Sequence, residues 1–391
     1  MSNSNNEGML LLLDEAYAEG VKSMEATVKK AADDAFAEGH DKGYTEGYGD
    51  ALKTIPFTPS TEEQAEGGTP IHNIENLATK AFFDELEKGG YGKDDYSKVW
   101  PYLFMAQTDR DEPSWTECCN PYVLYGKGTK VIVSCSDEPS QTVLPYKEMF
   151  RIFGLTPGKT YAWKMYNGTK VLSKGEFKTT GRVRWAGTNA TVELRNFRDL
   201  GGFGIKFGRL YRSENPDTVK AGSAEHLYLR DFLKISVQVN LRDSGARKDL
   251  FEKTYNYNIP AYSDVFTSSG LAKFRNAFNA IVNELKAGKN ILFNCKQGCD
   301  RTGTMAWLIQ SLCGMPLGYS EGHWELSGFD RCGNSKIWNW EEAAGGELRA
   351  FILKLIQKYG NDPYTMAYRL ATEVIGITDA KIKELRAVLV A

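Results

Sequence analysis

The spacing of apolar residues predicts several kinds of structure in succession along the chain, beginning with a helix. Within residues 1–55, apolar side chains recur every three or four positions, which is the period of one helix face. They are Leu13, Tyr17, Val21, Met24, Val28, Ala31 and Ala35. This stripe is close to a heptad seam and predicts a helical arm that self-associates or docks on another protein. A partly frayed arm is the alternative, because Gly39, Gly43 and Gly47 each weaken a helix by about 1 kcal/mol.

Residues 56–95 carry few apolar side chains and are predicted to connect the arm to the rest of the chain. From Pro56 to Pro70 the sequence combines proline, glycine and small polar residues, which is typical of a linker. Residues 73–88 place Ile74, Leu77 and Leu86 loosely on one side and predict a short helix.

Residues 96–185 change to short β-rich runs separated by turn residues. The clearest runs are residues 122–125, 130–133 and 160–166. Strands at this spacing predict a small antiparallel β-sandwich. Residues 155–161 resemble the turn-and-tyrosine segment of fibronectin type III domains, and residues 175–180 resemble their last strand. The resemblance implies a fibronectin III-like domain, with some other β-sandwich as the alternative.

Residues 186–391 alternate buried strands with amphipathic helices. Strands are predicted at 235–241 and 290–294, and helices at 272–285, 302–312, 347–359, 364–374 and 379–389. Alternation of this kind predicts an α/β domain around a mostly parallel sheet. The expected protein is therefore multidomain, with a helical arm, an all-β sandwich and a C-terminal α/β domain.

Composition excludes several classes of function. The net charge is −2 at pH 7, with 42% hydrophobic and 12% aromatic residues, so nothing indicates a nucleic-acid partner or general disorder. No apolar run approaches the roughly 20 residues of a membrane span. The start of the chain has no secretory signal, which predicts a cytoplasmic protein. Seven cysteines without a CxxC pair or a Cys/His cluster argue against a disulfide framework or a metal site, and no cofactor is expected.

One segment carries recognisable chemistry: the phosphate-binding loop, residues 295–303, between a predicted strand and a predicted helix. Such a loop can direct backbone N–H groups at one anion, and the helix N-terminus adds partial positive charge. Cys295 is the predicted nucleophile, because this positive field favours its thiolate form. Arg301 offers a planar fork for two phosphate oxygens, and Thr302 can donate its hydroxyl to the departing sulfur. The other expected substrate-binding residues are Lys296, Gln297, Gly298, Cys299 and Gly303.

The motif Cys-x-x-Gly-x-Asp-Arg-Thr-Gly resembles the loop of the atypical protein tyrosine phosphatases of bacteria and fungi. Residues 196–202, 208–213 and 239–243 also resemble the family's opening motif and its next strands. The resemblance implies metal-independent hydrolysis of a phosphomonoester through a cysteinyl-phosphate. It also implies that Asp300 is the general acid, with Asp243 and Asp264 as alternatives. Asp199 and Arg212 are expected to brace the loop, and His323 to be a packing or surface residue.

Two residues depart from the family pattern. Asn294 stands where the family usually has histidine, and it cannot contribute positive charge beside the nucleophile. Cys299 stands where the family often has lysine. Both departures concern the activation of Cys295.

Several functions remain open from the sequence. A phosphotyrosine protein is the default substrate, and a phosphoinositide is the second candidate. The alternative from another class is a non-catalytic structural or binding protein that keeps the phosphatase fold, for example a phage-particle component. In that case the protein would be associated with a virion.

Overall fold

The computed structural model describes residues 63–64, 68–75, 77–89, 120–187, 194–242, 245–267, 269–327 and 347–390. All of them belong to one unit of the chain, Pro59–Ala391. The predicted arm of residues 1–55, most of the predicted linker and residues 96–119 lie outside the described residues.

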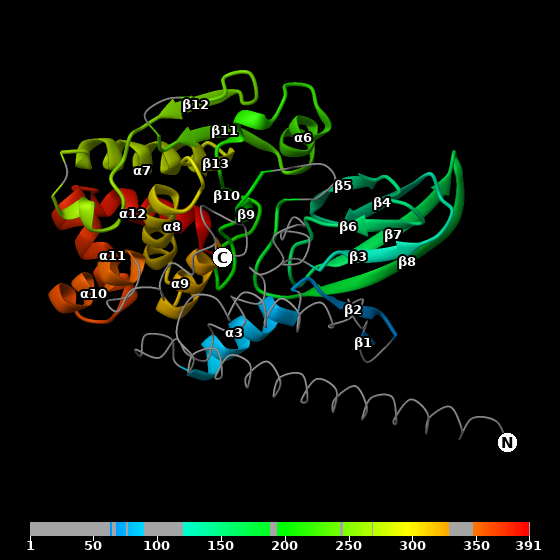
Figure 1. Ribbon diagram of the computed structural model, residues 1–391, viewed down its shortest axis with the longest axis horizontal. Helices are drawn as coiled ribbons and strands as arrows, with labels where there is room; N and C mark the ends of the chain where they lie inside the picture. The colour runs from blue at the N-terminus through cyan, green and yellow to red at the C-terminus, as the bar shows by residue number, and fades with distance from the viewer. Residues whose placement is uncertain are drawn as a thin grey trace, which may run out of the picture. The chain divides into compact units, whose positions relative to one another are not determined.

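The middle region, which was predicted to be rich in β-strands, contains six strands between residues 122 and 180 (Figure 1). They are β3 (Tyr122–Tyr125), β4 (Lys130–Cys135), β5 (Glu138–Val143), β6 (Met149–Ile152), β7 (Thr160–Asn167) and β8 (Lys170–Thr180). One sheet has the order β1-β2-β8-β7-β4-β5, in which β1 (Glu63–Gln64) and β2 (Pro70–Asn73) come from the segment before this region. A smaller sheet consists of β3 and β6. Phe150 of β6 and Phe177 of β8 are both fully buried in one shared core. The strands predicted at 122–125, 130–133 and 160–166 are confirmed.

Two strands of this sheet lie inside the segment predicted to be linker and helix. They are β1 (Glu63–Gln64) and β2 (Pro70–Asn73), and β2 pairs in parallel with β8. The side chain that fixes β2 is His72, which is fully buried and hydrogen-bonds the carbonyl of Asn120 at 2.9 Å. Its ring also packs edge-on against Tyr122. The buried imidazole of His72, together with the pairing to β8, thus fixes the position of β2. The polar residues around His72 do not predict a strand there.

The turn before β7 contains the feature on which the fibronectin III resemblance depends. The Tyr161 hydroxyl accepts a hydrogen bond from the backbone N–H of Thr156 at 2.8 Å, which is the geometry of a tyrosine corner. The same hydroxyl donates to a carboxylate oxygen of Glu138 at 2.7 Å. The relation to fibronectin type III domains itself stays a prediction.

The C-terminal region contains a second, mostly parallel sheet (Figure 1). Its order is β12-β11-β13-β10-β9, formed by β9 (Arg198–Asp199), β10 (Leu210–Ser213), β11 (Ile235–Asn240), β12 (Lys253–Asn256) and β13 (Asn290–Asn294). The four strands from β12 to β10 are parallel to one another, and β9 is antiparallel to β10. The register sets Asn294, at the end of the central strand, beside Ser213 and Asn240. The predicted α/β sheet is therefore confirmed.

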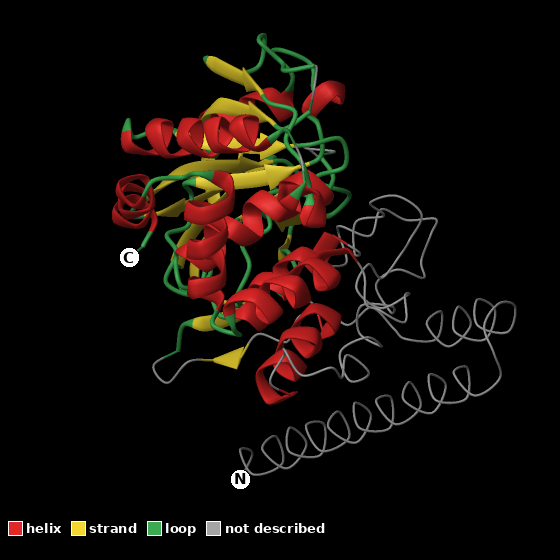
Figure 2. Cartoon of the chain, turned by 90° about the vertical axis from the view of Figure 1, so that its left-hand side faces the viewer, coloured by secondary structure: helices red, strands yellow, loops and turns green. Residues whose placement is uncertain are grey.

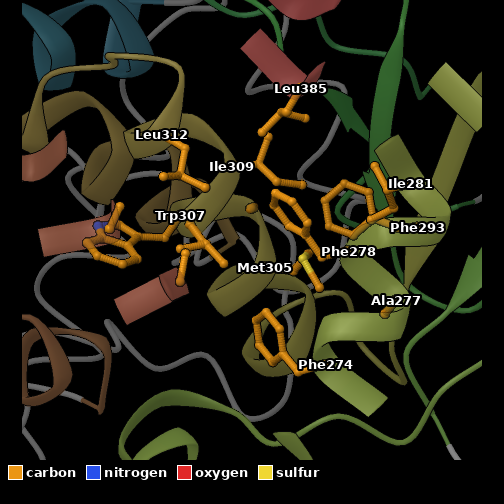
Figure 3. Close-up of a cluster of buried hydrophobic side chains, with 14 of the residues drawn as sticks. Phe274, Ala277, Phe278, Ile281, Phe293, Met305, Trp307, Ile309, Leu312 and Leu385 are labelled. Carbon is orange, nitrogen blue, oxygen red and sulfur yellow. The ribbon is translucent and has the colours of Figure 1, made fainter. Parts of the chain in front are cut away.

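Alternate residues of each strand enter different cores because successive side chains point to opposite faces. Ile291 and Phe293 of β13 pack into the larger core, and Leu292 between them packs into the smaller one. The larger core includes Phe278 from α7 (Leu271–Lys286) and Ile309 from α8 (Asp300–Leu312), as Figure 3 shows. Figure 2 shows helices lying along the strands of this sheet.

The predicted helices of this region are present with small differences in their ends. Besides α7 and α8, they are α10 (Glu347–Tyr359), α11 (Pro363–Arg369) with the π-helical turn η5 (Leu370–Ile375), and α12 (Asp379–Leu389). The helical elements that were not predicted include α6 (Ala224–Leu227), η2 (Tyr228–Phe232) and α9 (Leu317–Glu325). Helix α8 begins two residues earlier than predicted, so Asp300 and Arg301 lie in its first turn.

The two β-sheets of the middle region, formed by residues 122–180 together with β1 and β2, are called the sandwich. A helix from the segment before it packs against the C-terminal α/β region. It is α3 (Leu77–Gly89), and its Phe82, Phe83 and Leu86 surround Gly322 of α9. Arg182, directly after the sandwich, forms ion pairs with Glu75 and with two carboxylates of α3. Aromatic and ionic contacts thus connect α3 to the turn after β8 and to α9.

Among the described residues, no helix is both long enough and apolar enough to cross a membrane.

Candidate active site

The phosphate-binding loop lies at the carboxyl end of the central strand β13 and leads directly into α8. This is the edge of a parallel sheet at which α/β proteins bind their ligands. Gly298 has a φ of +73°, and a Cβ there would lie 2.5 Å from the carbonyl carbon and oxygen of Ser213. Only glycine fits this backbone conformation so close to β10. The glycine at position 298 therefore allows the loop to pack directly against the sheet.

Four consecutive carbonyl groups of the loop accept hydrogen bonds from the surrounding protein. Asn294 Nδ2 donates to the carbonyl of Cys295 at 3.2 Å, and the Asn215 backbone N–H donates to that of Lys296 at 3.3 Å. The two following carbonyls are bound by side chains from β10 and from the turn before β9. Asn196 Nδ2 donates to the Gln297 carbonyl at 3.3 Å, and Arg212 Nη2 donates to the Gly298 carbonyl at 2.5 Å.

These contacts determine the direction of the loop's N–H groups. All described peptide bonds are trans, and in a trans peptide the C=O and the next N–H point in opposite directions. Because the carbonyls of residues 295–298 are bound outward, the N–H groups of residues 296–299 point to the other side of the loop. Successive backbone N–H groups on one side of a loop are donors of the kind that bind anions.

Cys295 is 2% exposed and directly follows the buried end of β13. The Thr302 side chain is fully buried in α8, and among the described residues its hydroxyl has no hydrogen-bond partner. A buried hydroxyl without a partner carries a desolvation cost, so it marks a position at which a ligand or an intermediate could supply the missing bond.

Arg301 points from the first turn of α8 across the end of β11. Its Nη1 donates to Asn258 Oδ1 at 3.2 Å and lies 3.4 Å from the Leu241 carbonyl. The side chain is partly exposed. Lys296 is exposed and Gln297 is half-buried.

The other two predicted loop residues face the protein interior. Cys299 is fully buried, and its sulfur accepts a hydrogen bond from Asn196 Nδ2 at 3.4 Å. Gly303 lies against the indole of Trp324, so any side chain at position 303 would collide with that ring. The Gly303 N–H donates to the Cys299 carbonyl at 2.6 Å, so the backbone N–H of Cys299 is the donor that these two residues retain for a ligand.

Buried polar residues form the floor below the loop. Arg198 donates to Asn196 Oδ1, to the carbonyl of His323 at 2.5 Å and to the Ser327 hydroxyl at 3.2 Å. Arg212 also lies 3.4 Å from that hydroxyl. The predicted role of Arg212 as a brace therefore agrees with its contact to Gly298. Asp199 does not contact the loop: it accepts backbone N–H bonds from Gly201 and Gly208.

His323 belongs to this floor and is 1% exposed, so it packs in the interior. Burial, with further contributions from Arg198 and Arg212, holds the pKa of His323 well below its ordinary value of 6.5. Its ring nitrogens have no hydrogen-bond partner among the described residues.

Asn294 takes part in a chain of side-chain amides at the end of the sheet. Its Oδ1 accepts from Gln238 at 2.9 Å, and its Nδ2 lies 3.3 Å from Asn240 Oδ1. Asn240 in turn donates to Asn256 at 2.7 Å. The residue before Cys295 is thus positioned by two neutral amides of one neighbouring strand, β11.

The three candidates for the general acid lie in different environments. Asp300 is partly exposed in the first turn of α8, and its Oδ1 accepts a hydrogen bond from the Tyr262 hydroxyl at 2.9 Å. Asp264 is exposed in η3 (Tyr262–Phe266), and no hydrogen bond or ion pair to the loop is found for it. Asp243 lies outside the described residues. Of the two that are described, only Asp300 belongs to the loop's own helix.

Several residues of the site were not predicted from the sequence. Asn196 and Arg198 lie in the segment identified as an opening motif, but no role was assigned to either. Tyr262 and Trp324 had no signal at all, because they meet Asp300 and Gly303 only through tertiary packing. Within the part of the chain that the structure describes, no group of three or more His, Cys, Asp or Glu side chains is arranged to hold a metal ion.

Comparisons with known proteins found similarity to tyrosine phosphatases. Residues 190–318 match the family described as the tyrosine phosphatase family. A protein of Cupriavidus necator that is named as a proposed tyrosine-protein phosphatase is 28% identical over 156 residues, covering 31% of this chain and 56% of the relative. The match thus spans about half the length of that relative. The family match places the similarity to tyrosine phosphatases in residues 190–318.

A solved structure was also found. It is the core catalytic domain of the PP-IP phosphatase Siw14 from Saccharomyces cerevisiae in complex with citrate, with 16% identity and a TM-score of 0.30. The likeness covers 43% of this chain and 95% of that domain. A TM-score of this size supports no argument about structure or function.

Proposed function

We propose that this protein is a cysteine-dependent phosphatase that hydrolyses phosphomonoesters through a cysteinyl-phosphate, with phosphotyrosine proteins as its substrates. The observation that carries the proposal is the outward binding of four consecutive loop carbonyls, from Cys295 to Gly298. It directs the N–H groups of residues 296–299 to the opposite side of the loop, where they are able to bind an anion. A phosphoryl group has three equatorial oxygens for such donors to bind.

In the first step, the Cys295 thiolate attacks phosphorus in line with the leaving oxygen. The S–P bond forms as the P–O bond to the alcohol breaks. The guanidinium of Arg301 and the loop N–H groups stabilise the negative charge on the equatorial oxygens. Asp300 transfers its proton to the leaving oxygen, so the product is a neutral alcohol.

In the second step, water attacks the cysteinyl-phosphate. Asp300, now a carboxylate, accepts a proton from that water as the O–P bond forms. The S–P bond breaks, and the Thr302 hydroxyl donates a hydrogen bond to the departing thiolate. Its lack of a partner in the described residues supports this role, because no competing bond must first be broken. The overall reaction gives the alcohol and inorganic phosphate.

Hydrolysis of p-nitrophenyl phosphate by the full chain tests the chemistry. Cys295→Ser should abolish turnover, because serine is a weak nucleophile without a base, while inorganic phosphate should still bind. EDTA should not change the rate. Equal turnover in the variant and the parent would disprove the cysteine mechanism. Absence of turnover in the parent would favour a non-catalytic binding protein.

The substrate class requires a separate comparison. Phosphotyrosine peptides should have a higher kcat/KM than phosphoinositides presented in mixed micelles. A higher kcat/KM for phosphoinositides would leave the mechanism intact and change the substrate.

A further inference from the structure

Tyr262 has a backbone conformation that a bulky residue seldom adopts. Its φ is +45°, in the left-handed region, where side chains other than glycine are strained. The residue is 6% exposed and begins η3, far in sequence from the loop. Backbone strain of this kind persists only when surrounding contacts hold it, and such residues gather at functional sites. The contacts of Tyr262 therefore identify what the conformation achieves.

The direction of the hydrogen bonds at the Tyr262 hydroxyl is fixed by its neighbours. Trp324 Nε1 lies 3.2 Å from this hydroxyl, and an indole N–H can only donate. The tyrosine oxygen must therefore accept from Trp324, which leaves its own proton for Asp300 Oδ1 at 2.9 Å. The bonds run in one direction, from Trp324 through Tyr262 to Asp300.

Burial keeps this donor protonated. Tyr262 lies in the interior, and desolvation, followed by the nearby Asp300, raises the pKa of its phenol well above 10. The hydroxyl thus remains a donor throughout the range in which a phosphatase of this kind would work.

The backbone of Tyr262 is tied to the same helical turn as its side chain. Its N–H donates to Thr304 Oγ1 at 3.0 Å, and that hydroxyl donates to the backbone carbonyl of Asp300 at 2.9 Å. Trp324 meanwhile packs against Gly303, one turn along. Both ends of Tyr262 are therefore fixed relative to the start of α8.

We propose that Tyr262 is a positioning residue that holds the Asp300 carboxyl by Oδ1 and leaves Oδ2 to exchange the proton with the leaving oxygen. No hydrogen bond of Oδ2 is found among the described residues, whereas Oδ1 is bound. A carboxyl held at one oxygen loses rotational freedom, so its second oxygen stays in one place when the substrate arrives. This inference rests on the proposed function, because it assigns a task to the proton donor of that reaction.

The prediction concerns leaving groups rather than overall rate. An aryl phosphate with a poor leaving group, such as phenyl phosphate, needs protonation of its oxygen more than 2,4-dinitrophenyl phosphate does. Tyr262→Phe should lower kcat/KM, which reports only the steps up to formation of the cysteinyl-phosphate, about tenfold or more for phenyl phosphate, a part of the roughly 10²–10⁴-fold that general acid catalysis contributes. For 2,4-dinitrophenyl phosphate the loss should be about twofold or less, within the usual error of additivity.

A double-mutant cycle shows whether Tyr262 acts through Asp300. In an Asp300→Asn background, adding Tyr262→Phe should cause little further loss, about twofold or less. Equal losses for both leaving groups, or losses that multiply in the double variant, would overturn the proposal and leave Tyr262 as a structural residue.

The sandwich offers a matched control. Tyr161 is 4% exposed, donates to Glu138 and accepts from a backbone N–H, so its hydroxyl makes the same kinds of bond away from the loop. Tyr161→Phe should lower the melting temperature without changing the ratio of rates for the two leaving groups. If the control changes that ratio as much as Tyr262→Phe does, the proposal is wrong.

Two further measurements keep the test decisive. If Tyr262→Phe does not fold, Trp324→Phe removes the N–H that orients the tyrosine, together with part of the buried ring, and it should show the same selective loss for phenyl phosphate. Cys295-dependent turnover by the parent, measured first, separates the two proposals. Without it the proposed function fails, and with it an unchanged leaving-group ratio rejects only the role of Tyr262.

Discussion

The sandwich and the C-terminal α/β region both bury a tyrosine that donates a hydrogen bond to a carboxylate. They differ in whether the second oxygen of that carboxylate is also hydrogen-bonded. In the sandwich, both oxygens of Glu138 are bound, one by Tyr161 at 2.7 Å and one by the Thr156 hydroxyl at 2.5 Å. At the phosphate-binding loop, Tyr262 binds one oxygen of Asp300, and no bond to the other is found in the described residues. Both carboxylate oxygens are thus hydrogen-bonded in the sandwich, whereas among the described residues only one is hydrogen-bonded at the loop.

Buried threonines repeat this contrast. Thr179 of the sandwich is fully buried, donates to the Thr156 carbonyl at 2.6 Å and accepts from the Lys159 N–H at 3.1 Å. Thr302 of α8 is equally buried, but within the described chain its hydroxyl has no partner. A stable interior satisfies its polar groups, so an incomplete set indicates a place for a ligand. The comparison therefore separates polar burial that stabilises the fold from polar burial that serves the site.

The largest expected effects come from removing one buried ring in each region. Phe177→Ala in β8 and Phe293→Ala in β13 both delete a fully buried side chain, and each should cost about 3–5 kcal/mol of unfolding free energy. Only Phe293→Ala should also lower kcat, because this residue precedes Asn294 and the nucleophile. Calorimetry and p-nitrophenyl phosphate turnover at a temperature where both variants are folded would check this. A comparable kcat loss in Phe177→Ala would mean that the sandwich influences the site.

Two glycines with positive φ give the next test. Gly298→Ala adds a methyl group 2.5 Å from the Ser213 backbone, so the loop must shift. We expect turnover to fall by about 10²-fold, the scale of loss for a displacement of roughly 1 Å at a reacting group. In the β7–β8 turn, Gly168 has a φ of +58° and open space around its Cβ position. Gly168→Ala should cost about 1–2 kcal/mol of stability and leave turnover unchanged.

If both glycine variants lost turnover equally, backbone strain rather than the collision with β10 would explain the loss at position 298.

The buried His323, whose ring nitrogens have no hydrogen-bond partner among the described residues, should also make the free energy of unfolding depend on pH. The folded pKa of His323 lies well below 6.5, so the unfolded chain binds the proton more tightly. The stability that the neutral imidazole contributes is therefore fully present above pH ~6.5. Between the unfolded and the folded pKa it is lost as pH falls, by about 1.4 kcal/mol of unfolding free energy per pH unit. At pH ~5 the parent should therefore have lost stability that His323→Phe retains. Urea unfolding of both proteins between pH 5 and 8 measures the difference, and parallel curves would contradict it.

The sequence was sufficient wherever function and structure depend on contiguous residues. The loop and its flanking strand and helix lie in one segment of the chain, so the motif predicted their order correctly. Helix α8 was placed two residues too late because Asp300 and Arg301 were assigned to the loop, although both fit a first helical turn. Strand β2 was missed because its position depends on the burial of His72 against distant residues.

Residues that reach the loop from other elements could not be predicted in the same way. Tyr262 and Asp300 are 38 positions apart, and Trp324 lies 62 positions from Tyr262. No periodicity or spacing in one sequence specifies such a contact, because it depends on how η3 and α9 pack beside α8. Arg212 was identified as a brace through a family resemblance, whereas its bond to the Gly298 carbonyl required coordinates.

The smallest expected effects, and the sharpest contrast, come from replacing the two buried threonines by valine, which keeps the shape and removes the hydroxyl. Thr179→Val breaks two hydrogen bonds and leaves the Lys159 N–H and the Thr156 carbonyl unbound, so it should cost about 1–3 kcal/mol of stability. Thr302→Val removes a hydroxyl that has no partner among the described residues, so stability should stay constant or rise.

The kinetic result should be the reverse. If the Thr302 hydroxyl stabilises the departing thiolate, its loss should slow the second step about tenfold or more, since a hydrogen bond to a charged group contributes roughly 1.5–3 kcal/mol. The first step should be nearly unaffected, so Thr302→Val should release a burst of p-nitrophenolate and accumulate phosphorylated Cys295, detectable by mass spectrometry after acid quenching. Thr179→Val should show the burst behaviour of the parent. A destabilised Thr302→Val without a burst would place Thr302 with Thr179 among the residues that serve only the fold.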